Sequence, residues 1–236
     1  DLAMKLRMGA ADDIVTTALL ATRAPILLAP SMNVHMWNHP ATRDNLEVLQ
    51  ARGCHQVGPG SGDMACGHVG DGRLAEPWDI ARAVARLLAP QDLAGRRVVV
   101  TAGPTREPMD PVRFISNPSS GKMGFAIAAA LQLRGARVTL VAGPCALDTP
   151  PGVTRVDIQT AEQMSEALSD LDDVDAVCMA AAVSDWRPEI THGHKVKKSA
   201  EPETLTFVRT PDILAGLGER FEGRARRPLL VGFAAE

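Results

Sequence analysis

Apolar residues occur along the chain in short runs and in helical spacing, and the two patterns alternate. Short apolar runs predict buried strands, whereas apolar residues at every third or fourth position predict helices packed on one face. The predicted strands cover 24–30, 97–103, 137–144, 153–158, 174–183, 203–209 and 228–235, and the predicted helices cover 40–53, 78–90, 121–135, 160–171 and 210–221. This alternation predicts an α/β fold with mostly parallel sheets.

Local signals mark the ends of two helices and one break in the pattern. Thr160 followed by Gln163 is the sequence pattern of a capping box. Thr210 precedes Pro211, a residue that suits the first helical position, so Thr210 is the predicted cap of the last helix. The glycine-rich stretch 58–77 is predicted to be a long functional loop without regular structure.

The chain divides into two blocks of alternating strands and helices. Residues 1–90 form the first block, 91–96 a linker, and 97–236 the second block. In a doubly wound sheet of this kind, ligands bind beyond the carboxyl ends of the strands. The residues that follow the predicted strands are therefore the first candidates for a site.

Composition excludes several classes of protein. The 236 residues are 45% hydrophobic, which is enough for packed cores and argues against disorder. A net charge of -3 gives no basic excess for nucleic acid or an anionic membrane surface, so neither is expected as a partner. The four cysteines are widely spaced and form no C-x-x-C pair, so a reduced, cytoplasmic protein is expected.

The segment RFISNPSSGKMG, which begins at Arg113, looks at first like a triphosphate-binding loop. That loop needs G-x-x-x-x-G-K-[ST], but Ser116 stands at the first glycine position and Met123 follows Lys122. The P-loop interpretation therefore fails. The serines and Gly121 still precede a helix whose free N–H groups favour an anion, although an ordinary capped helix start explains the segment too.

Other polar segments follow predicted strands. Asp185 lies just past the strand 174–183, where a carboxylate could accept from a ribose or base or bind a metal. Three lysines fall within Lys195–Lys198, enough charge for a triphosphate, although a solvated lysine run is the commoner explanation. In the first block, Asn33 follows a strand, and Cys66 lies in the glycine-rich stretch, where a thiol could act on a substrate. The four histidines of this block show no metal-ligand spacing.

These segments together resemble one family over essentially the whole chain. They are GPTREPMDPVRFISNPSSGKMG, AAAVSDWRP, KVKK, TPDIL and VGFAAE in the second block, and PSMNVHMW and ACGHVGDGRL in the first. The chain resembles bifunctional coenzyme A biosynthesis proteins, in which a phosphopantothenoylcysteine decarboxylase is fused to a CTP-dependent phosphopantothenate–cysteine ligase of bacterial type. The resemblance implies the C-terminal part of a flavodoxin-like decarboxylase domain followed by a Rossmann-like ligase domain.

For the ligase, the resemblance implies that CTP activates the carboxylate of 4'-phosphopantothenate as an acyl-cytidylate, which the amine of cysteine then attacks. Asn117 would serve the turnover of the acyl-cytidylate, and Lys195 the activation step. Magnesium would accompany the triphosphate, with ligands that the sequence does not identify. The positions implied to bind CTP are Met179, Ala180, Ala181, Asp185, Lys195, Pro211, Asp212, Ile213, Leu214 and Phe233.

For the decarboxylase, the resemblance implies FMN as cofactor and 4'-phosphopantothenoylcysteine as substrate. Asn33 would bind the substrate carboxylate, and Cys66 would complete the return to a saturated thiol. Ser31 departs from the alanine usual in the family motif P-A-M-N. The family's catalytic histidine and flavin-phosphate loop lie upstream of Asp1, and further triphosphate-binding lysines lie beyond Glu236, so the chain is expected to be truncated at both ends. By resemblance, the ligase halves pair and the decarboxylase halves form trimers.

Two other functions were weighed. A nicotinamide-dependent reductase is disfavoured because no G-x-G-x-x-G follows a strand and no acidic residue stands at the expected distance. A flavodoxin-like regulatory or binding subunit without catalysis is the alternative. The presence of Asn33, Cys66 and the lysines of 195–198 argues against it.

Overall fold

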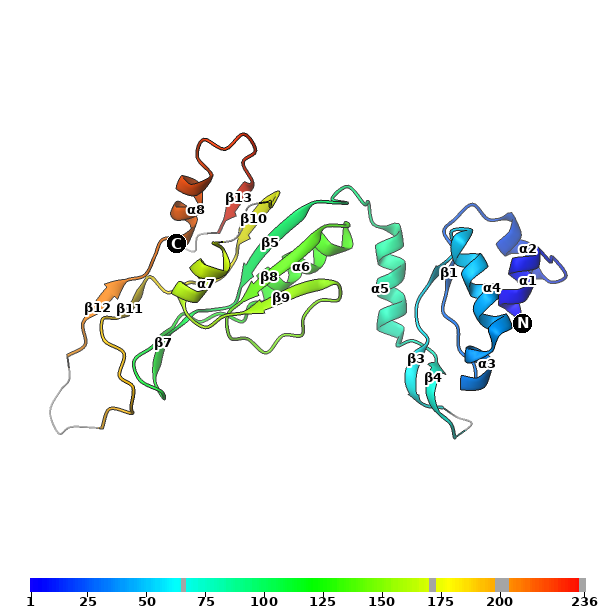
Figure 1. The fold of residues 1–236 in the computed structure, drawn as a ribbon, viewed down its shortest axis with the longest axis horizontal. Helices are drawn as coiled ribbons and strands as arrows, with labels where there is room; N and C mark the ends of the chain where they lie inside the picture. The colour runs from blue at the N-terminus through cyan, green and yellow to red at the C-terminus, as the bar shows by residue number, and fades with distance from the viewer. Residues whose placement is uncertain (65–66, 170–172, 198–203, 234–236) are drawn as a thin grey trace. The chain divides into compact units, whose positions relative to one another are not determined.

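The computed structural model describes residues 1–64, 67–169, 173–197 and 204–233. The chain forms two compact units, residues 1–89 and 90–236, which are described separately (Figure 1). Both contain helices and parallel strands, which confirms the predicted α/β fold. Among the described helices, none has the length and apolar character needed to cross a membrane.

The first unit is built mainly from short elements. Its parallel pair of strands is only two residues long on each side, so it offers little sheet surface for helices to cover. Apolar side chains such as Met8, Ile14 and Trp78 are consequently exposed. The elements are α1 (Leu2–Met8), α2 (Ile14–Ala21), β1 (Leu27–Leu28), α3 (Val34–Asn38), α4 (Pro40–Ala51), β2 (His55–Gln56), β3 (Gly60–Asp63), β4 (Val69–Arg73) and α5 (Pro77–Leu88).

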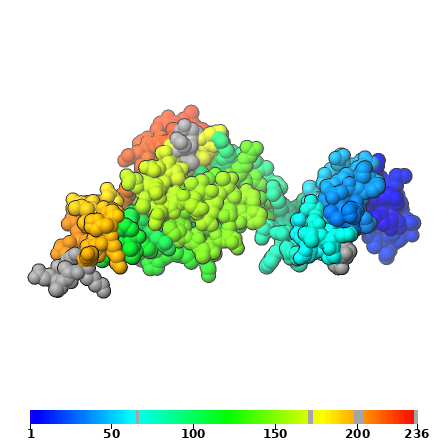
Figure 2. All heavy atoms as spheres, turned by 60° about the horizontal axis from the view of Figure 1, so that its bottom comes forward, coloured from blue at the N-terminus to red at the C-terminus, as the bar shows by residue number. Residues whose placement is uncertain are grey.

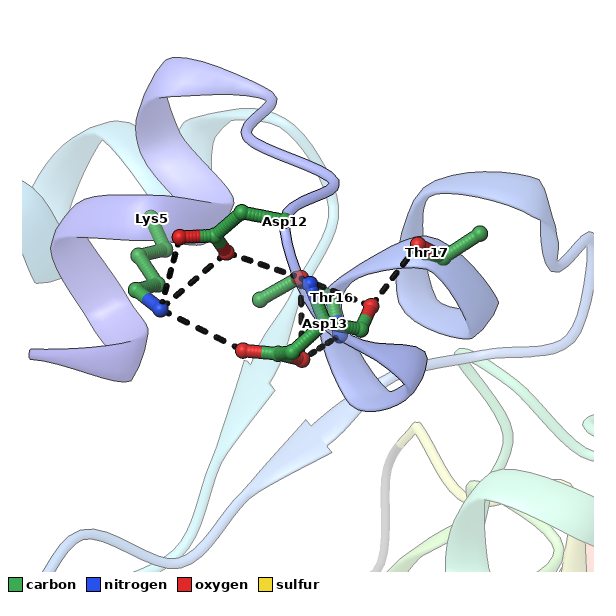
Figure 3. A network of polar contacts seen from close by, with 5 residues as sticks. All are labelled: Lys5, Asp12, Asp13, Thr16 and Thr17. Atoms are coloured by element: carbon green, nitrogen blue, oxygen red, sulfur yellow. Dashed lines mark hydrogen bonds and ion pairs between the residues drawn. The ribbon is translucent and has the colours of Figure 1, made fainter.

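A network of polar contacts links α1 to the start of α2 (Figure 3). Asp13 is the N-cap of α2, and its carboxylate accepts from the backbone N–H of Thr16 at 2.8 Å. The ammonium of Lys5 donates to Asp12 at 3.1 Å and to Asp13 at 3.2 Å. Hydrogen bonds to these two carboxylates raise the pKa of Lys5. The network therefore caps α2 and fixes the turn before it.

The glycine-rich stretch forms a hairpin, so the prediction of a loop without regular structure was wrong. β3 and β4 pair antiparallel. The carbonyl of Gly72 accepts from the backbone N–H of Met32 at 2.9 Å. A Cβ on Gly72 would stand 2.1 Å from the carbonyl oxygen of Met32, so only glycine permits this approach. The glycines thus serve close packing of a strand against the loop before α3.

The second unit contains a five-stranded parallel sheet in the order β13-β10-β5-β8-β9. Two antiparallel hairpins, β6–β7 and β11–β12, extend from it and lie beside one another (Figures 1 and 2). The elements are β5 (Arg97–Ala102), β6 (Arg106–Pro108), β7 (Phe114–Ser116), α6 (Lys122–Leu133), β8 (Arg137–Ala142), β9 (Val153–Asp157), α7 (Ala161–Ala167), β10 (Ala176–Met179), β11 (Trp186–Pro188), β12 (Phe207–Arg209), α8 (Ile213–Phe221) and β13 (Leu229–Gly232).

Helices cover both faces of this sheet because successive strand residues point to opposite sides. Val98 and Val100 of β5 pack with Phe125 and Ala128 of α6. Val99 packs on the other face, in the cluster that α7 and α8 build. The buried residues of this cluster that come from α7, its C-cap and α8 are Met164, Leu168, Ile213, Leu217 and Phe221. The doubly wound arrangement predicted for this part of the chain is therefore confirmed.

The two predicted caps had different outcomes. Thr160 caps α7, and the side chain of Gln163 completes the capping box. Thr210 does not cap α8; Asp212 does, by accepting from the backbone N–H of Ala215 at 2.9 Å. The hydroxyl of Thr210 donates instead to the carbonyl of Ser184, so this side chain joins the segment before α8 to the segment after β10.

Residues 91–96 are bonded to the second unit. Asp92 pairs with Arg134 at the end of α6, and the N–H of Leu93 donates to the carbonyl of Arg134 at 3.1 Å. Leu93 also packs against the α6 side of the core. The segment expected to be a linker is thus held against α6.

Candidate functional site

A cleft of about 480 Å³ opens at the carboxyl ends of β10 and β13. These strands pair in parallel, so Met179 and Gly232 lie side by side at the same edge. Starting from the central strand β5, the chain adds β8 and β9 on one side of the sheet. It then reverses direction and adds β10 and β13 on the other side of β5. Ligands of doubly wound sheets bind beside such a reversal of strand order. The start of α8 closes the other side of the cleft.

Most positions expected to bind CTP line this one cleft. They are Met179, Ala181, Asp185, Pro211, Asp212, Ile213, Leu214 and Phe233. Ala180 and Lys195 are not among the lining residues. The fold therefore gathers three segments that are far apart in the sequence: the residues after β10, those before and within α8, and those after β13.

Hydrogen bonds fix the wall of the cleft. The N–H of Ser184 donates to the hydroxyl of Thr105 at 3.0 Å, and the hydroxyl of Thr210 donates to the carbonyl of Ser184 at 2.5 Å. The N–H of Thr210 donates to the carbonyl of Asp185 at 3.0 Å. Ser184 and Thr105 are both buried. Hydrogen bonds with Thr105 and Thr210 thus hold the backbone of Ser184 and Asp185. The side chain of Asp185 is exposed at the cleft.

Asn117 lies against the same wall without lining the cleft. Its amide nitrogen Nδ2 donates to the carbonyl of Val183 at 2.9 Å, and Val183 is a lining residue. Asn117 is half-buried. The bond links the segment before α6 to the segment after β10. Asn117 is therefore attached to the backbone that forms the wall of the cleft.

Lys195 is exposed in the connection from β11 to β12, and Lys198 lies outside the described residues. The following residue, Val196, is anchored to Asp110 in the turn between β6 and β7. The carboxylate of Asp110 accepts from the N–H of Val196 at 3.2 Å and from the Arg113 guanidinium at 2.7 Å. The lysine segment is thus attached to the β6–β7 hairpin.

The charge of Asp110 is stabilised although its side chain is buried. Burial alone would raise its pKa, but the Arg113 guanidinium and three backbone N–H groups outweigh it. Together they hold the pKa of Asp110 well below its usual range. Asp110 therefore remains a carboxylate and can hold the segment that carries Lys195.

Arg209 and Trp186 also line the cleft, and neither was singled out from the sequence. They are directly opposite one another in the β11–β12 hairpin. Trp186 directly follows Asp185, and Arg209 directly precedes Thr210. Their position beside these motifs was the one feature of the sequence that could have marked them as candidate site residues. Which strands pair, and hence which side chains meet, was not visible in the sequence.

In the first unit, Asn33 caps α3 through its side chain. Its oxygen Oδ1 accepts from the N–H of His35 at 2.9 Å, and its nitrogen Nδ2 lies 2.8 Å from Nδ1 of His68. His68 is one of the four histidines without metal-ligand spacing, and its contact brings the turn between β3 and β4 onto Asn33. Cys66, predicted to act on substrate, lies outside the described residues.

Fold and cleft together define a doubly wound α/β protein with a ligand cleft at the carboxyl edge of its sheet. The chain belongs to the family described as DNA/pantothenate metabolism flavoprotein C-terminal domain, whose model matches residues 93–236. The family model described as Flavoprotein matches residues 2–89. These matches confirm the family that the motifs predicted.

Relatives similar to this chain bear the name coenzyme A biosynthesis bifunctional protein CoaBC. The Bacillus subtilis protein is 48% identical over 98% of this chain and 57% of its own length. The Escherichia coli protein is 47% identical over 100% of this chain and 59% of its own length. This chain thus spans less than two thirds of each relative. A crystal structure of the C-terminal domain of a CoaBC protein, 46% identical, superposes with a TM-score of 0.52 and covers 61% of this chain and 66% of the other.

Proposed function

We propose that the chain is part of a bifunctional enzyme of coenzyme A biosynthesis, and that its second unit belongs to the ligase. The ligase joins cysteine to 4'-phosphopantothenate at the expense of CTP. The observation that carries this proposal is the cleft, because the segments expected to bind CTP converge on it from three parts of the sequence. A site at the carboxyl edge of a doubly wound sheet suits a nucleotide.

In the first step, a carboxylate oxygen of 4'-phosphopantothenate attacks the α-phosphorus of CTP. Pyrophosphate leaves, and an acyl-cytidylate forms. Lys195 stabilises the negative charge that grows on the phosphate oxygens. Lys195 is not among the residues that line the cleft, and it lies in the segment that Asp110 attaches to the β6–β7 hairpin. The N-terminus of α6 at Gly121 offers N–H groups for the phosphate of 4'-phosphopantothenate.

In the second step, the amine of cysteine attacks the acyl carbon, and CMP leaves. The geometry of Asn117 suits this step. Its Nδ2 is engaged with the carbonyl of Val183. The oxygen Oδ1 is then the amide atom that accepts a hydrogen bond from the incoming amine and orients its lone pair toward the acyl carbon.

Magnesium would be held at the cleft by carboxylates and by the triphosphate itself. Asp185 and Asp212 both line the cleft, which suits a cation that usually takes one or two protein carboxylates. Within the described ranges, no cluster of three or more His, Cys, Asp or Glu side chains suits a metal. The residues present thus fit a magnesium ion bound together with its nucleotide, where it neutralises phosphate charge.

The first unit would belong to the decarboxylase, which acts on 4'-phosphopantothenoylcysteine with FMN. FMN would supply the redox chemistry. Asn33 follows β1 at the edge of a parallel strand pair, where α/β domains bind ligands. Its Nδ2 carries two N–H donors, so one would donate to the substrate carboxylate while Nδ2 also faces Nδ1 of His68 and Oδ1 stays on the N–H of His35. Cys66 would return the product to a saturated thiol.

The ligase proposal is tested by pyrophosphate release in a protein that contains the complete ligase half. We expect release that requires CTP, magnesium, 4'-phosphopantothenate and active enzyme, with peptide-bond formation only when cysteine is added. ATP replacing CTP with equal efficiency would contradict the assignment of the nucleotide. An Asp185→Asn variant should raise the KM for CTP and leave the KM for cysteine unchanged.

A further inference from the structure

We propose that Arg209 binds the phosphate groups of the nucleotide in the cleft, and that Trp186 positions its guanidinium. The proposal rests on the proposed function, since it assigns further residues to the same site. It starts from the charge balance of the cleft and from the pairing of one hairpin.

The cleft-lining residues that were expected to bind CTP supply no positive charge for its phosphates. Asp185 and Asp212 bring two carboxylates to the wall, while Lys195 is not part of it. Among the described residues that line the cleft, Arg209 is the single basic side chain. A nucleoside triphosphate adds several negative charges to this environment. Arg209 is therefore placed to offset charge that one magnesium ion leaves unbalanced.

Trp186 holds the guanidinium in a defined orientation. The two residues are register partners across the β11–β12 hairpin. The guanidinium carbon of Arg209 lies 5.5 Å from the centroid of the Trp186 ring, within the range of a cation–π contact. A guanidinium that lies on an aromatic ring by its face leaves the N–H groups at its edge to donate. A planar edge of N–H donors matches two phosphate oxygens.

Hydrogen bonds hold the backbone next to Trp186 and Arg209, so the orientation of the guanidinium toward the cleft is maintained. The residue before Trp186 and the residue after Arg209 are joined by the bond from the N–H of Thr210 to the carbonyl of Asp185. The hydroxyl of Ser184 also donates to the carbonyl of Trp186 at 2.8 Å. The base of the hairpin is thus fixed to the cleft, and the exposed guanidinium extends from it.

The test compares ligands that do and do not carry phosphates. In a protein that contains the complete ligase half, calorimetric titration would measure CTP and cytidine on the wild type, Arg209→Gln and Arg209→Lys. Inorganic tripolyphosphate would be titrated in competition with CTP. In Arg209→Gln, we expect affinity for CTP and tripolyphosphate to fall about tenfold or more, which is the effect of losing a charge-assisted hydrogen bond. Affinity for cytidine should stay unchanged. Arg209→Lys should recover part of the loss, because it restores charge without the planar edge.

Arg137→Gln is the matched control, since it removes the same charge at the start of β8, at the amino ends of the parallel strands, whereas the cleft lies at their carboxyl ends. It should leave all affinities unchanged. Unchanged CTP affinity in Arg209→Gln, or an equal loss for cytidine, would overturn the phosphate contact while CTP binding itself stands. Failure of the wild type to bind CTP would instead remove the proposed function, and this inference with it.

Trp186 is tested as a positioning residue through its dependence on Arg209. Trp186→Leu should weaken CTP several-fold in the wild-type background and have little further effect in Arg209→Gln. Trp186→Phe keeps an aromatic face and should retain most of the affinity. Equal effects of Trp186→Leu in both backgrounds would show that the indole acts on the cleft independently of Arg209.

Discussion

Asn117 connects the segment before α6 to the wall of the cleft through one hydrogen bond. In a protein with the complete ligase half, Asn117→Ala should let acyl-cytidylate accumulate, because the amine of cysteine is no longer oriented. Product formation should fall about a hundredfold, the usual cost of one catalytic hydrogen bond. Chromatography with labelled CTP would measure the intermediate. Normal product formation without accumulation would remove Asn117 from the second step.

Asp110 gives a prediction for the dependence of stability on pH. Its folded pKa lies below the unfolded value of about 4, so its contribution is complete above that pH and is lost as pH falls toward the folded pKa. Asp110→Asn should therefore lower the free energy of unfolding at pH 7, and its deficit should shrink below about pH 4. Urea titrations between pH 7 and 3 measure this. A deficit that is constant over that range would contradict it.

Asp92→Asn is the control for this measurement. Asp92 pairs with Arg134, but both side chains are exposed, so the pair should stabilise the fold little. Asp110→Asn should also make the bond after Lys195 more susceptible to trypsin, because the carboxylate anchors the N–H of Val196. Equal cleavage in both variants would show that Asp110 does not hold the lysine segment.

At the residue scale, the sequence predicted the members of the cleft better than their contacts. Asp185 and Phe233 belong to motifs, and a motif identifies a residue without its neighbours. Trp186, Arg209 and His68 were not singled out, because their contacts come from strand pairing and from the approach of a hairpin. Neither is encoded in local spacing.

At the element scale, the contact between α6 and β5 depends on one glycine. A Cβ on Gly124 would lie 2.5 Å from the Cβ of Ala102 and 2.7 Å from the carbonyl oxygen of Thr101. Gly124→Ala should thus destabilise the second unit by about 1–3 kcal/mol, as overpacking does, although alanine is the better helix former. Guanidinium unfolding measures the change.

Gly216 of α8 is the matched control. Nothing lies within 4 Å of a Cβ placed there, so Gly216→Ala should stabilise by up to about 1 kcal/mol through helix propensity alone. The two substitutions therefore have opposite predicted signs for the same chemical change. Stabilisation by both would mean that α6 shifts away from β5 at little cost.

Local sequence signals predicted a structural feature correctly where all the residues that form it are close together in the sequence. The capping box of Thr160 depends on residues within one turn, and it formed as predicted. Thr210 failed as a cap because its hydroxyl is used by Ser184, a partner far away in the sequence. The hairpin β3–β4 was missed since its glycines looked like loop residues, whereas they allow backbone to approach Met32.

At the scale of the molecule, the second unit carries the better defined chemistry. Alternating apolar runs were sufficient to predict its parallel sheet, because inner strands such as β5 and β8 are buried between helices on both faces. They were not sufficient for the strand order, which decides where the cleft opens. Among its described residues, the first unit has one pair of short parallel strands and leaves many apolar side chains exposed.

We expect the cleft at the start of α8 to bind CTP. A crystal structure of the complete ligase half with CTP and magnesium would locate the nucleotide. The nucleotide should lie between Asp185, the segment Pro211–Leu214 and Phe233, with its phosphates toward Arg209. An empty cleft at saturating CTP, or a nucleotide bound elsewhere on the protein, would show that this cleft is not the CTP site.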